Sequence, residues 1–276
     1  MIIRVAHSPD SDDAFMFYAL AEGLVDTEGL TYVHELQDIE SLNRRALKGE
    51  LEVTAVSIHA YASLTDRYAL LTSGASMGDG YGPRLVSRTG TARADVRGKR
   101  VAVPGLMTSA YLALRLYEPD FLAIPTPFDA IEGAVVRGEV DFGLLIHESQ
   151  LTFGESGLHL VVDLGEWWFD ETGLPLPLGG NVARKDLGFH KLRMISRHLR
   201  ASIAYGLQNR EMALNHAMRF ARGLDRVKAD QFVGMYVNDW TLDYGERGRQ
   251  AIREFLGRGV AAGIIPRAVA VEFVEE

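Results

Sequence analysis

His147 is the residue whose type and position best suit chemistry. It follows the apolar run at residues 142–146, so it stands at the end of an expected buried strand. An imidazole has an ordinary pKa of about 6.5 and can accept or donate a proton near neutral pH. Two interpretations stay open on these grounds: a general acid–base residue, or a histidine that caps the turn where Glu148 and Ser149 begin a helix.

Thr108 and Ser109 form a second candidate site, because they follow Pro104 and Gly105 and open an expected helix at residues 109–117. Backbone N–H groups and hydroxyls at a helix N-terminus can bind an anion or a carboxylate. Ordinary N-capping explains the same two residues. The two interpretations are compatible, since a cap that faces a cleft can also bind a ligand.

The sequence gives little support for a metal site. No histidines show His-x-x-x-His or His-x-Glu spacing, and the acidic run at residues 10–13 lacks the Gly and distal Glu of an EF-hand loop. That run is interpreted as a turn in which Asp12 or Asp13 caps a helix. The chain has no cysteine, which excludes thiolate catalysis, zinc–thiolate sites and iron–sulfur clusters. No metal is therefore expected.

The other seven histidines are weaker candidates. His7 follows the first expected strand and could face the same cleft as His147, whereas His59 is placed on a short helix after Ser57. Two more are expected to pack or face solvent within strands, and three to lie on the surface of C-terminal helices: His34 and His159, then His190, His198 and His216.

Length and composition bound the class of protein. The 276 residues suffice for one large domain or two modest ones, and 47% of them are hydrophobic. The net charge of −8 argues against a protein that binds nucleic acid by neutralising phosphates. No apolar stretch has the length of a membrane span, and the N-terminal apolar run has the length of a strand rather than of a signal peptide. We expect a cytoplasmic protein that acts on a small molecule, with neither a membrane nor a nucleic acid as partner.

Strands and helices are expected to alternate twice along the chain, which is typical of an α/β fold with parallel pairing. The first group has strands at residues 2–6, 30–36 and 51–56, with a helix that begins after Asp38 and stops at Gly49. The second group has strands at residues 100–103, 121–124 and 140–146. Residues 174–180 are expected to be extended. From residue 189 onward the chain is expected to be helical, ending in a short tail after Pro266.

A short internal repeat favours two similar lobes. Residues 48–53 match residues 137–142 position by position: a helix end, a Gly, an acidic residue and a strand. We expect one lobe from residues 1–88 and 179–276, and another from residues 89–178. Ligands bind beyond the carboxyl ends of parallel strands, so Ser57 and His147 are expected to face a shared cleft.

Several segments together resemble the 1,4-dihydroxy-6-naphthoate synthase family of the futalosine pathway to menaquinone. The most specific are His-Glu-Ser at residues 147–149 and Leu-Pro-Leu-Pro-Leu-Gly at residues 174–179. The resemblance covers nearly the whole chain and includes these further segments: residues 8–20, 104–111, 162–168 and 236–238. The chain departs from a variant of the family that has Asn and Thr where Asp12 and Ala14 stand here.

The resemblance implies a two-lobed type II periplasmic-binding-protein-like α/β fold with the ligand between the lobes. It also implies a lyase that converts cyclic dehypoxanthinyl futalosine to 1,4-dihydroxy-6-naphthoate without a metal or an organic cofactor. His147 matches the family's general base. The family's substrate contacts correspond to five residues: Ala55, Val56, Ser57, Thr108 and Ser109.

Two other functions are compatible with this architecture. One is the sister enzyme that dehydrates chorismate in the same pathway, against which the His-Glu-Ser segment argues. The other is a non-catalytic small-molecule-binding protein, since folds are shared between functions. The lack of a recognisable signal peptide counts against that alternative. The oligomeric state stays open.

Overall fold

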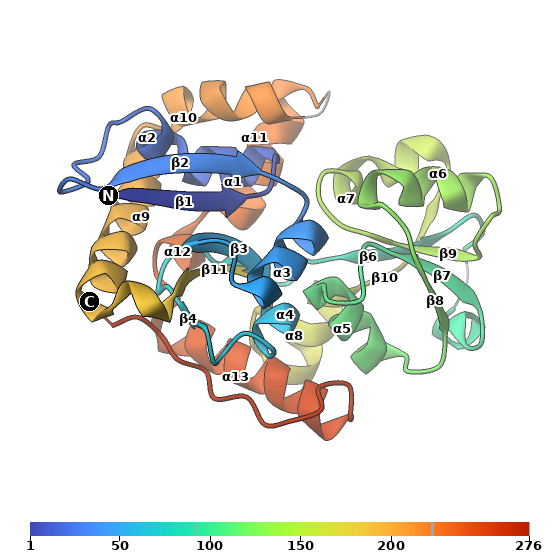
Figure 1. Cartoon of the computed structure of the whole chain (residues 1–276). Coiled ribbons are helices and arrows are strands. Elements are labelled where there is room, and N and C mark those ends of the chain that lie inside the picture. Colours follow the sequence, from blue (N-terminus) through green and yellow to red (C-terminus); the bar gives the residue numbers. More distant parts are fainter. Residues whose placement is uncertain (91, 222–223, 276) are drawn as a thin grey trace.

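The computed structural model describes residues 1–90, 92–221 and 224–275, and these form two β-sheets surrounded by helices (Figure 1). The strands are β1 (Ile2–His7), β2 (Thr31–Leu36), β3 (Val53–Ser57), β4 (Tyr68–Leu70), β5 (Ser76–Gly78), β6 (Arg84–Ser87), β7 (Arg100–Val103), β8 (Leu122–Pro125), β9 (Phe142–Leu145), β10 (His159–Asp163) and β11 (Leu176–Arg184).

The helices cover both sheets and fill the C-terminal third of the chain. They are α1 (Ser11–Met16), α2 (Tyr18–Ala21), α3 (Ile39–Lys48), α4 (Ile58–Tyr61), α5 (Ser109–Tyr117), α6 (Ile131–Val136), α7 (Ser149–Thr152), α8 (Leu164–Thr172), α9 (Phe189–Gln208), α10 (Arg210–Ala217), α11 (Arg226–Tyr236), α12 (Asp239–Leu242) and α13 (Gly245–Ala261). Short 3₁₀ helices are η1 (Arg93–Val96), η2 (Phe128–Ala130), η3 (Phe153–Ser156), η4 (Lys185–Leu187) and η5 (Met218–Phe220).

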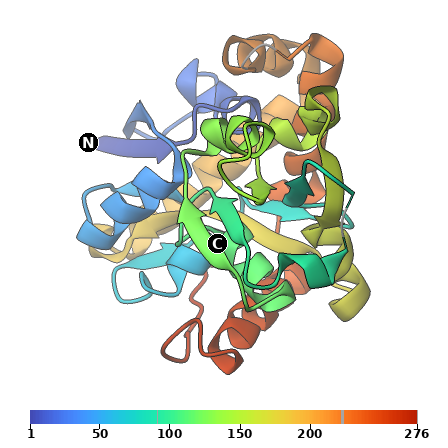
Figure 2. The ribbon, with the colours of Figure 1, turned by 90° about the vertical axis from the view of Figure 1, so that its right-hand side faces the viewer.

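The first sheet has the order β2-β1-β3-β11-β4, with β5 also paired to β11. Strands β1, β2 and β3 run parallel, as their alternation with helices predicts, and β11 is antiparallel to β3. The second sheet has the order β10-β6-β9-β7-β8, with β7 parallel to β8 and β9. The two sheets lie on opposite sides of the molecule (Figures 1 and 2). The lobe boundaries expected near residues 88 and 178 stay a prediction, and residue 276 lies outside the described residues.

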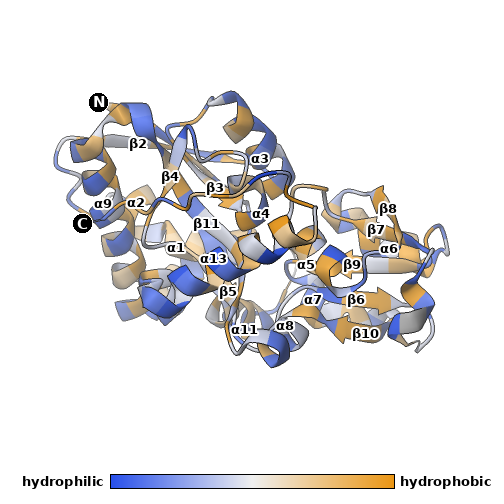
Figure 3. Ribbon diagram, turned by 90° about the horizontal axis from the view of Figure 1, so that it is seen from below, coloured by the Kyte–Doolittle hydropathy of each residue, from blue (hydrophilic) through white to orange (hydrophobic). Residues whose placement is uncertain are grey.

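One hydrophobic core joins the two halves. Helix α5 follows a strand of the second sheet, yet its buried Leu112 and Leu114 belong to the same apolar cluster as Val56 of the first sheet and Phe255 of α13. Figure 3 shows apolar residues along β6, β7 and β9, and mixed polar and apolar faces on helices such as α13. This shared core fixes the helix that begins with Ser109 against the first half of the molecule.

Local sequence signals place two of the helices near the site. The Asp38 side chain accepts a hydrogen bond from Ser41 N at 3.0 Å, and Gly49 ends α3 at φ 71°, so the expected start and stop of this helix are confirmed. The bounds expected for α5 are also confirmed. The expected capping of α1 by Asp12 or Asp13 is wrong: α1 begins at Ser11, and both carboxylates lie in its first turn.

Candidate active site

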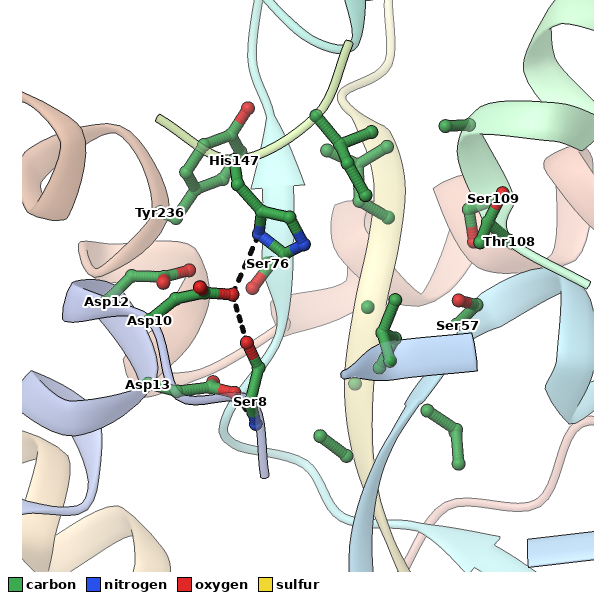
Figure 4. A pocket seen from close by; sticks show the side chains of 18 of the residues that line it. Ser8, Asp10, Asp12, Asp13, Ser57, Ser76, Thr108, Ser109, His147 and Tyr236 are labelled. Carbon is green, nitrogen blue, oxygen red and sulfur yellow. Dashed lines mark hydrogen bonds and ion pairs between the residues drawn. The ribbon is translucent and has the colours of Figure 1, made fainter. Parts of the chain in front are cut away.

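A cavity between the two sheets collects all six residues expected to form a site. It is lined by His147, Ala55, Val56, Ser57, Thr108 and Ser109. Other polar side chains that line it are Ser8, Asp10, Asp12, Asp13, Ser76, Gln150, Asn181 and Tyr236 (Figure 4). Both halves of the fold contribute to its wall, since Ala55, Val56 and Ser57 belong to β3 of the first sheet and Ile146 and His147 directly follow β9 of the second.

His147 enters the cavity from a strained turn after β9. Its φ is +58°, in the left-handed region that side chains other than glycine seldom adopt. Ser149 Oγ donates a hydrogen bond to Ile146 O at 2.8 Å, which holds the turn, and the Phe128 ring packs edge-on against the imidazole at 4.7 Å between centroids. Backbone strain of this kind concentrates at functional sites.

The imidazole of His147 meets the carboxylate of Asp10. The distance from His147 Nδ1 to Asp10 Oδ2 is 2.8 Å, and the Asp10 side chain is only 1% exposed. Figure 4 shows the other ring nitrogen directed away from Asp10 into the cavity. Burial, the largest single cause, lowers the pKa of His147. The charge and hydrogen bond of Asp10, together with the charges of Glu148 and Asp12, outweigh burial and raise this pKa to about 9.

Two further carboxyl groups lie beside this pair and favour their protonated forms. Burial and the neighbouring charges of Asp13 and Asp10 raise the pKa of Asp12 well above its ordinary value. Burial also raises the pKa of Asp13 to about 7, although the backbone N–H of Ser8 donates to it at 2.7 Å. Sequence reasoning missed these groups because a turn and a helix cap explain an acidic run. A signal was present, since capping uses one carboxylate and the run has three.

The hydroxyl of Ser57 is fixed at the carboxyl end of β3. Asn43 Nδ2 donates to Ser57 Oγ at 3.1 Å, and Ser57 N donates to Asn43 Oδ1 at 2.9 Å. Asn43 is fully buried in α3, so it satisfies both groups of Ser57. Gly179 of β11 lies opposite Ser57 in the sheet and leaves room for the cavity there.

Thr108 and Ser109 face the cavity at the start of α5, and both are held by the neighbouring structure. Thr108 caps the helix, because its Oγ1 accepts a hydrogen bond from Tyr111 N at 3.2 Å. Ser109 Oγ accepts one from the backbone N–H of His59 at 3.2 Å. Capping and cleft lining therefore coexist in these residues. His59 lies on α4 after Ser57, where it was expected.

Gln150 and Tyr236 line the cavity, although neither was predicted to be a site residue. Tyr236 ends α11 and donates a hydrogen bond from its hydroxyl to Gln150 Oε1 at 2.9 Å. Burial raises the pKa of Tyr236, so this hydroxyl keeps its proton. The contact connects α11 with α7 in the wall of the cavity.

Two expectations about histidines are wrong. His7 does not line the cavity; it is the last residue of β1, stacks on Phe17 at 4.3 Å between ring centroids, and burial lowers its pKa to about 3. His198 is not a surface group. It is 3% exposed, and its two ring nitrogens contact Tyr32 Oη at 2.9 Å and Glu28 Oε1 at 3.3 Å.

A search of the described residues finds no group of three or more His, Cys, Asp or Glu side chains placed to hold a metal ion. In the same part of the chain, no helix has the length and apolar character needed to cross a membrane.

Comparison with known proteins gives one family. A family described as menaquinone biosynthesis matches residues 3–261. A curated 1,4-dihydroxy-6-naphtoate synthase of Thermus thermophilus is 43% identical over 95% of both chains. One of Streptomyces coelicolor is 40% identical over 96% of this chain and 95% of its own.

Two solved structures are similar to this chain in fold. A protein of Archaeoglobus fulgidus is 48% identical and superposes with a TM-score of 0.92 over 95% of this chain and 98% of its own. The periplasmic aliphatic sulphonate-binding protein SsuA of Escherichia coli superposes with a TM-score of 0.65 at 12% identity, over 97% of this chain and 89% of its own. The expected α/β fold of the periplasmic-binding-protein kind is confirmed.

Proposed function

The chain belongs to the menaquinone biosynthesis family, and from that premise we propose that its cavity is the active site of a carbon–carbon lyase that forms 1,4-dihydroxy-6-naphthoate from cyclic dehypoxanthinyl futalosine. The observation that supports this most is the meeting of His147 and Asp10 in a cavity that also presents hydroxyls from both sheets. A proton acceptor and fixed hydrogen-bonding groups are what a base-initiated cleavage requires.

The proposed mechanism begins at Nε2 of His147, the ring nitrogen that does not face Asp10. This nitrogen removes a proton from the sugar part of the substrate, and the carboxylate of Asp10 stabilises the imidazolium that forms. When the proton comes from a sugar hydroxyl, the electron pair that it leaves forms a carbonyl group on the released sugar fragment. The carbon–carbon bond breaks in the same step, and its electron pair enters the ring that becomes the aromatic naphthalene-diol. Formation of that aromatic system drives the cleavage.

The hydroxyls of Ser57 and Ser109 hold the substrate from opposite sides in this proposal. The start of α5 suits a carboxylate or hydroxyl group, because the helix dipole and its N-terminal N–H groups favour negative charge there. Contacts between the halves, such as Tyr236 with Gln150, keep water out and align the base.

The direct test is to incubate the purified protein separately with cyclic dehypoxanthinyl futalosine and with chorismate. Formation of 1,4-dihydroxy-6-naphthoate, followed by absorbance and mass spectrometry, supports the proposal. Turnover of chorismate alone would identify the chorismate dehydratase instead. Binding of either compound without turnover would identify a binding protein, whose fold SsuA shares. A cytoplasmic location and a small-molecule substrate are part of the same proposal.

Removing either serine hydroxyl is expected to weaken substrate binding. Ser57→Ala and Ser109→Ala each delete about one hydrogen bond to substrate, so KM should rise about 2–12-fold, the equivalent of about 0.5–1.5 kcal/mol. Each variant also leaves a protein donor without its acceptor: Asn43 Nδ2 in the first and His59 N in the second. Ser156→Ala, at an exposed serine, is the control. An unchanged KM in both cavity variants would contradict the binding role.

Metal chelators are expected to leave the activity intact. The proposed proton transfer uses His147 and Asp10, and no step in it requires a metal ion. Turnover is measured before and after incubation with EDTA and removal of the chelator. Activity that disappears and returns with one divalent ion would contradict the mechanism.

A further inference from the structure

Asp10 occupies an unusual place for a carboxylate that follows the first strand. It stands at the N-cap position of α1, yet its side chain makes no capping hydrogen bond to that helix. One of its oxygens, Oδ2, instead accepts hydrogen bonds from Ser8 Oγ and contacts His147 Nδ1 at 2.8 Å. The Asp10 side chain therefore does not cap α1 but bonds to His147, which is far away in the sequence.

The contact between these residues connects the two halves of the molecule. Asp10 follows β1 of the first sheet, and His147 follows β9 of the second. Figure 4 shows the Asp10 carboxylate between Ser8 and the His147 ring, with the rest of the cavity on the far side of that ring. Asp10 and His147 can therefore contact each other only when the two sheets are packed as they are here.

We propose that Asp10 is the positioning residue of His147, holding Nδ1–H on its carboxylate so that Nε2 is directed at the substrate. The inference rests on the proposed role of His147 as base. A neutral imidazole carries one N–H, and the hydrogen bond made by one nitrogen decides which nitrogen is free to accept a proton. With Nδ1–H bound to Asp10, the accepting nitrogen is the one that faces the cavity.

Stability alone does not explain the pair. Burying two opposite charges costs a desolvation penalty that their attraction often only balances. Both groups here line a cavity, and His147 is held in a strained conformation. An arrangement with these costs is typical of functional sites.

Titratable groups other than Asp10 also surround the imidazole of His147. Asp12 and Asp13 come from α1, Glu148 follows His147 in the chain, and Tyr236 approaches from α11. Among these groups Asp10 contributes most to raising the pKa of His147, through both its charge and its hydrogen bond. Removing that charge should therefore change the titration of His147 even though the other carboxyl groups remain.

The test compares the wild-type protein with Asp10→Asn, which keeps the size of the side chain. The imidazole of His147 is titrated by NMR in the ligand-free protein, and its signals are assigned by their loss in His147→Asn. Its pKa is expected near 9 in the wild type and about 1–3 lower in Asp10→Asn. This measurement needs no turnover.

The kinetic comparison uses the same variants. In Asp10→Asn the limiting kcat should fall about 10²–10⁴-fold, because the amide can donate to Nδ1 and so place the proton on Nε2. The acid limb of the kcat/KM–pH profile, which reports the free enzyme, should also move to lower pH. Asp10→Glu, which keeps the charge, should retain more activity than Asp10→Asn. Glu28→Gln removes a carboxylate from His198, outside the cavity, and should leave kcat and its pH profile unchanged.

The outcomes separate the two proposals. If the wild type forms no naphthoate but the pKa of His147 is lower in Asp10→Asn, the proposed function fails, and the titration still supports the bond between Asp10 and His147 Nδ1. If the wild type is active and Asp10→Asn matches it in His147 pKa, kcat and pH profile, the positioning role is overturned.

Discussion

Replacing His147 with alanine should lower kcat about 10²–10⁴-fold, the usual contribution of a positioned base, while the protein stays folded. His147→Asn is the better matched variant. Asparagine tolerates the left-handed backbone at this position, where φ is +58°, and its amide can still bond to Asp10. It cannot accept a proton at neutral pH, so it should be as inactive as alanine.

Substrate binding should survive both changes, because the ring acts mainly in proton transfer. The measurements are kcat from steady-state kinetics, substrate affinity from calorimetry, and folding from circular dichroism. Near-normal kcat in two folded variants would remove His147 from the mechanism. The structure makes Asp12, rather than the buried His7, the residue to examine next.

The same assignment fixes the direction of the pH dependence. A base must be unprotonated, and the pKa of His147 is raised to about 9. Below that pH the imidazole of the free enzyme holds its proton, so kcat/KM should rise about tenfold per pH unit between pH 7 and 8 and level off above about pH 9. A kcat/KM that falls over this range would indicate that the protonated ring acts as a general acid.

Structural features of this protein can be predicted from the sequence when the residues that determine them lie close together in the chain. The caps at Asp38 and Gly49, and the strand and helix at residues 100–117, were predicted because the signals lie within a few residues of the ends they mark. The position of His147 at a cleft was also predictable, since it follows from a strand end and a rule about α/β sheets.

Long-range pairing was beyond the sequence. Nothing near Asp10 indicates that its partner is His147, because that contact depends on how two separate sheets face each other. The same limit explains the error at His198, whose partners Tyr32 and Glu28 come from the other end of the chain. A turn explains Asp10 and a polar helix face explains His198 as long as only neighbouring residues are considered. Only the packing of distant segments shows the true partners of both side chains.

The second large effect is expected at Gly165, where the start of α8 touches residues 79–83, the segment that joins β5 of the first sheet to β6 of the second. A Cβ atom on Gly165 would lie 1.8 Å from Tyr81 O and 2.0 Å from Tyr81 C, and a Cβ on Gly78 would lie 1.9 Å from the same oxygen. The Tyr81 carbonyl is therefore enclosed between two glycines. Its neighbours are also fixed, since Leu164 N donates to Pro83 O at 2.9 Å and Pro83 lines the cavity.

Gly165→Ala should destabilise the protein by about 3 kcal/mol, because the obstacle is backbone that cannot rotate aside as a flexible side chain can. For a chain of this size, that corresponds to a Tm lower by about 6–12 °C in a thermal melt. Gly257→Ala is the matched control: it lies inside α13 with open space around its Cβ position, so alanine there should leave Tm unchanged or raise it slightly. If Gly165→Ala has the same Tm as the wild type, residues 81–82 can move away from α8. The contact between these residues and Gly165 is then not rigid, contrary to this prediction.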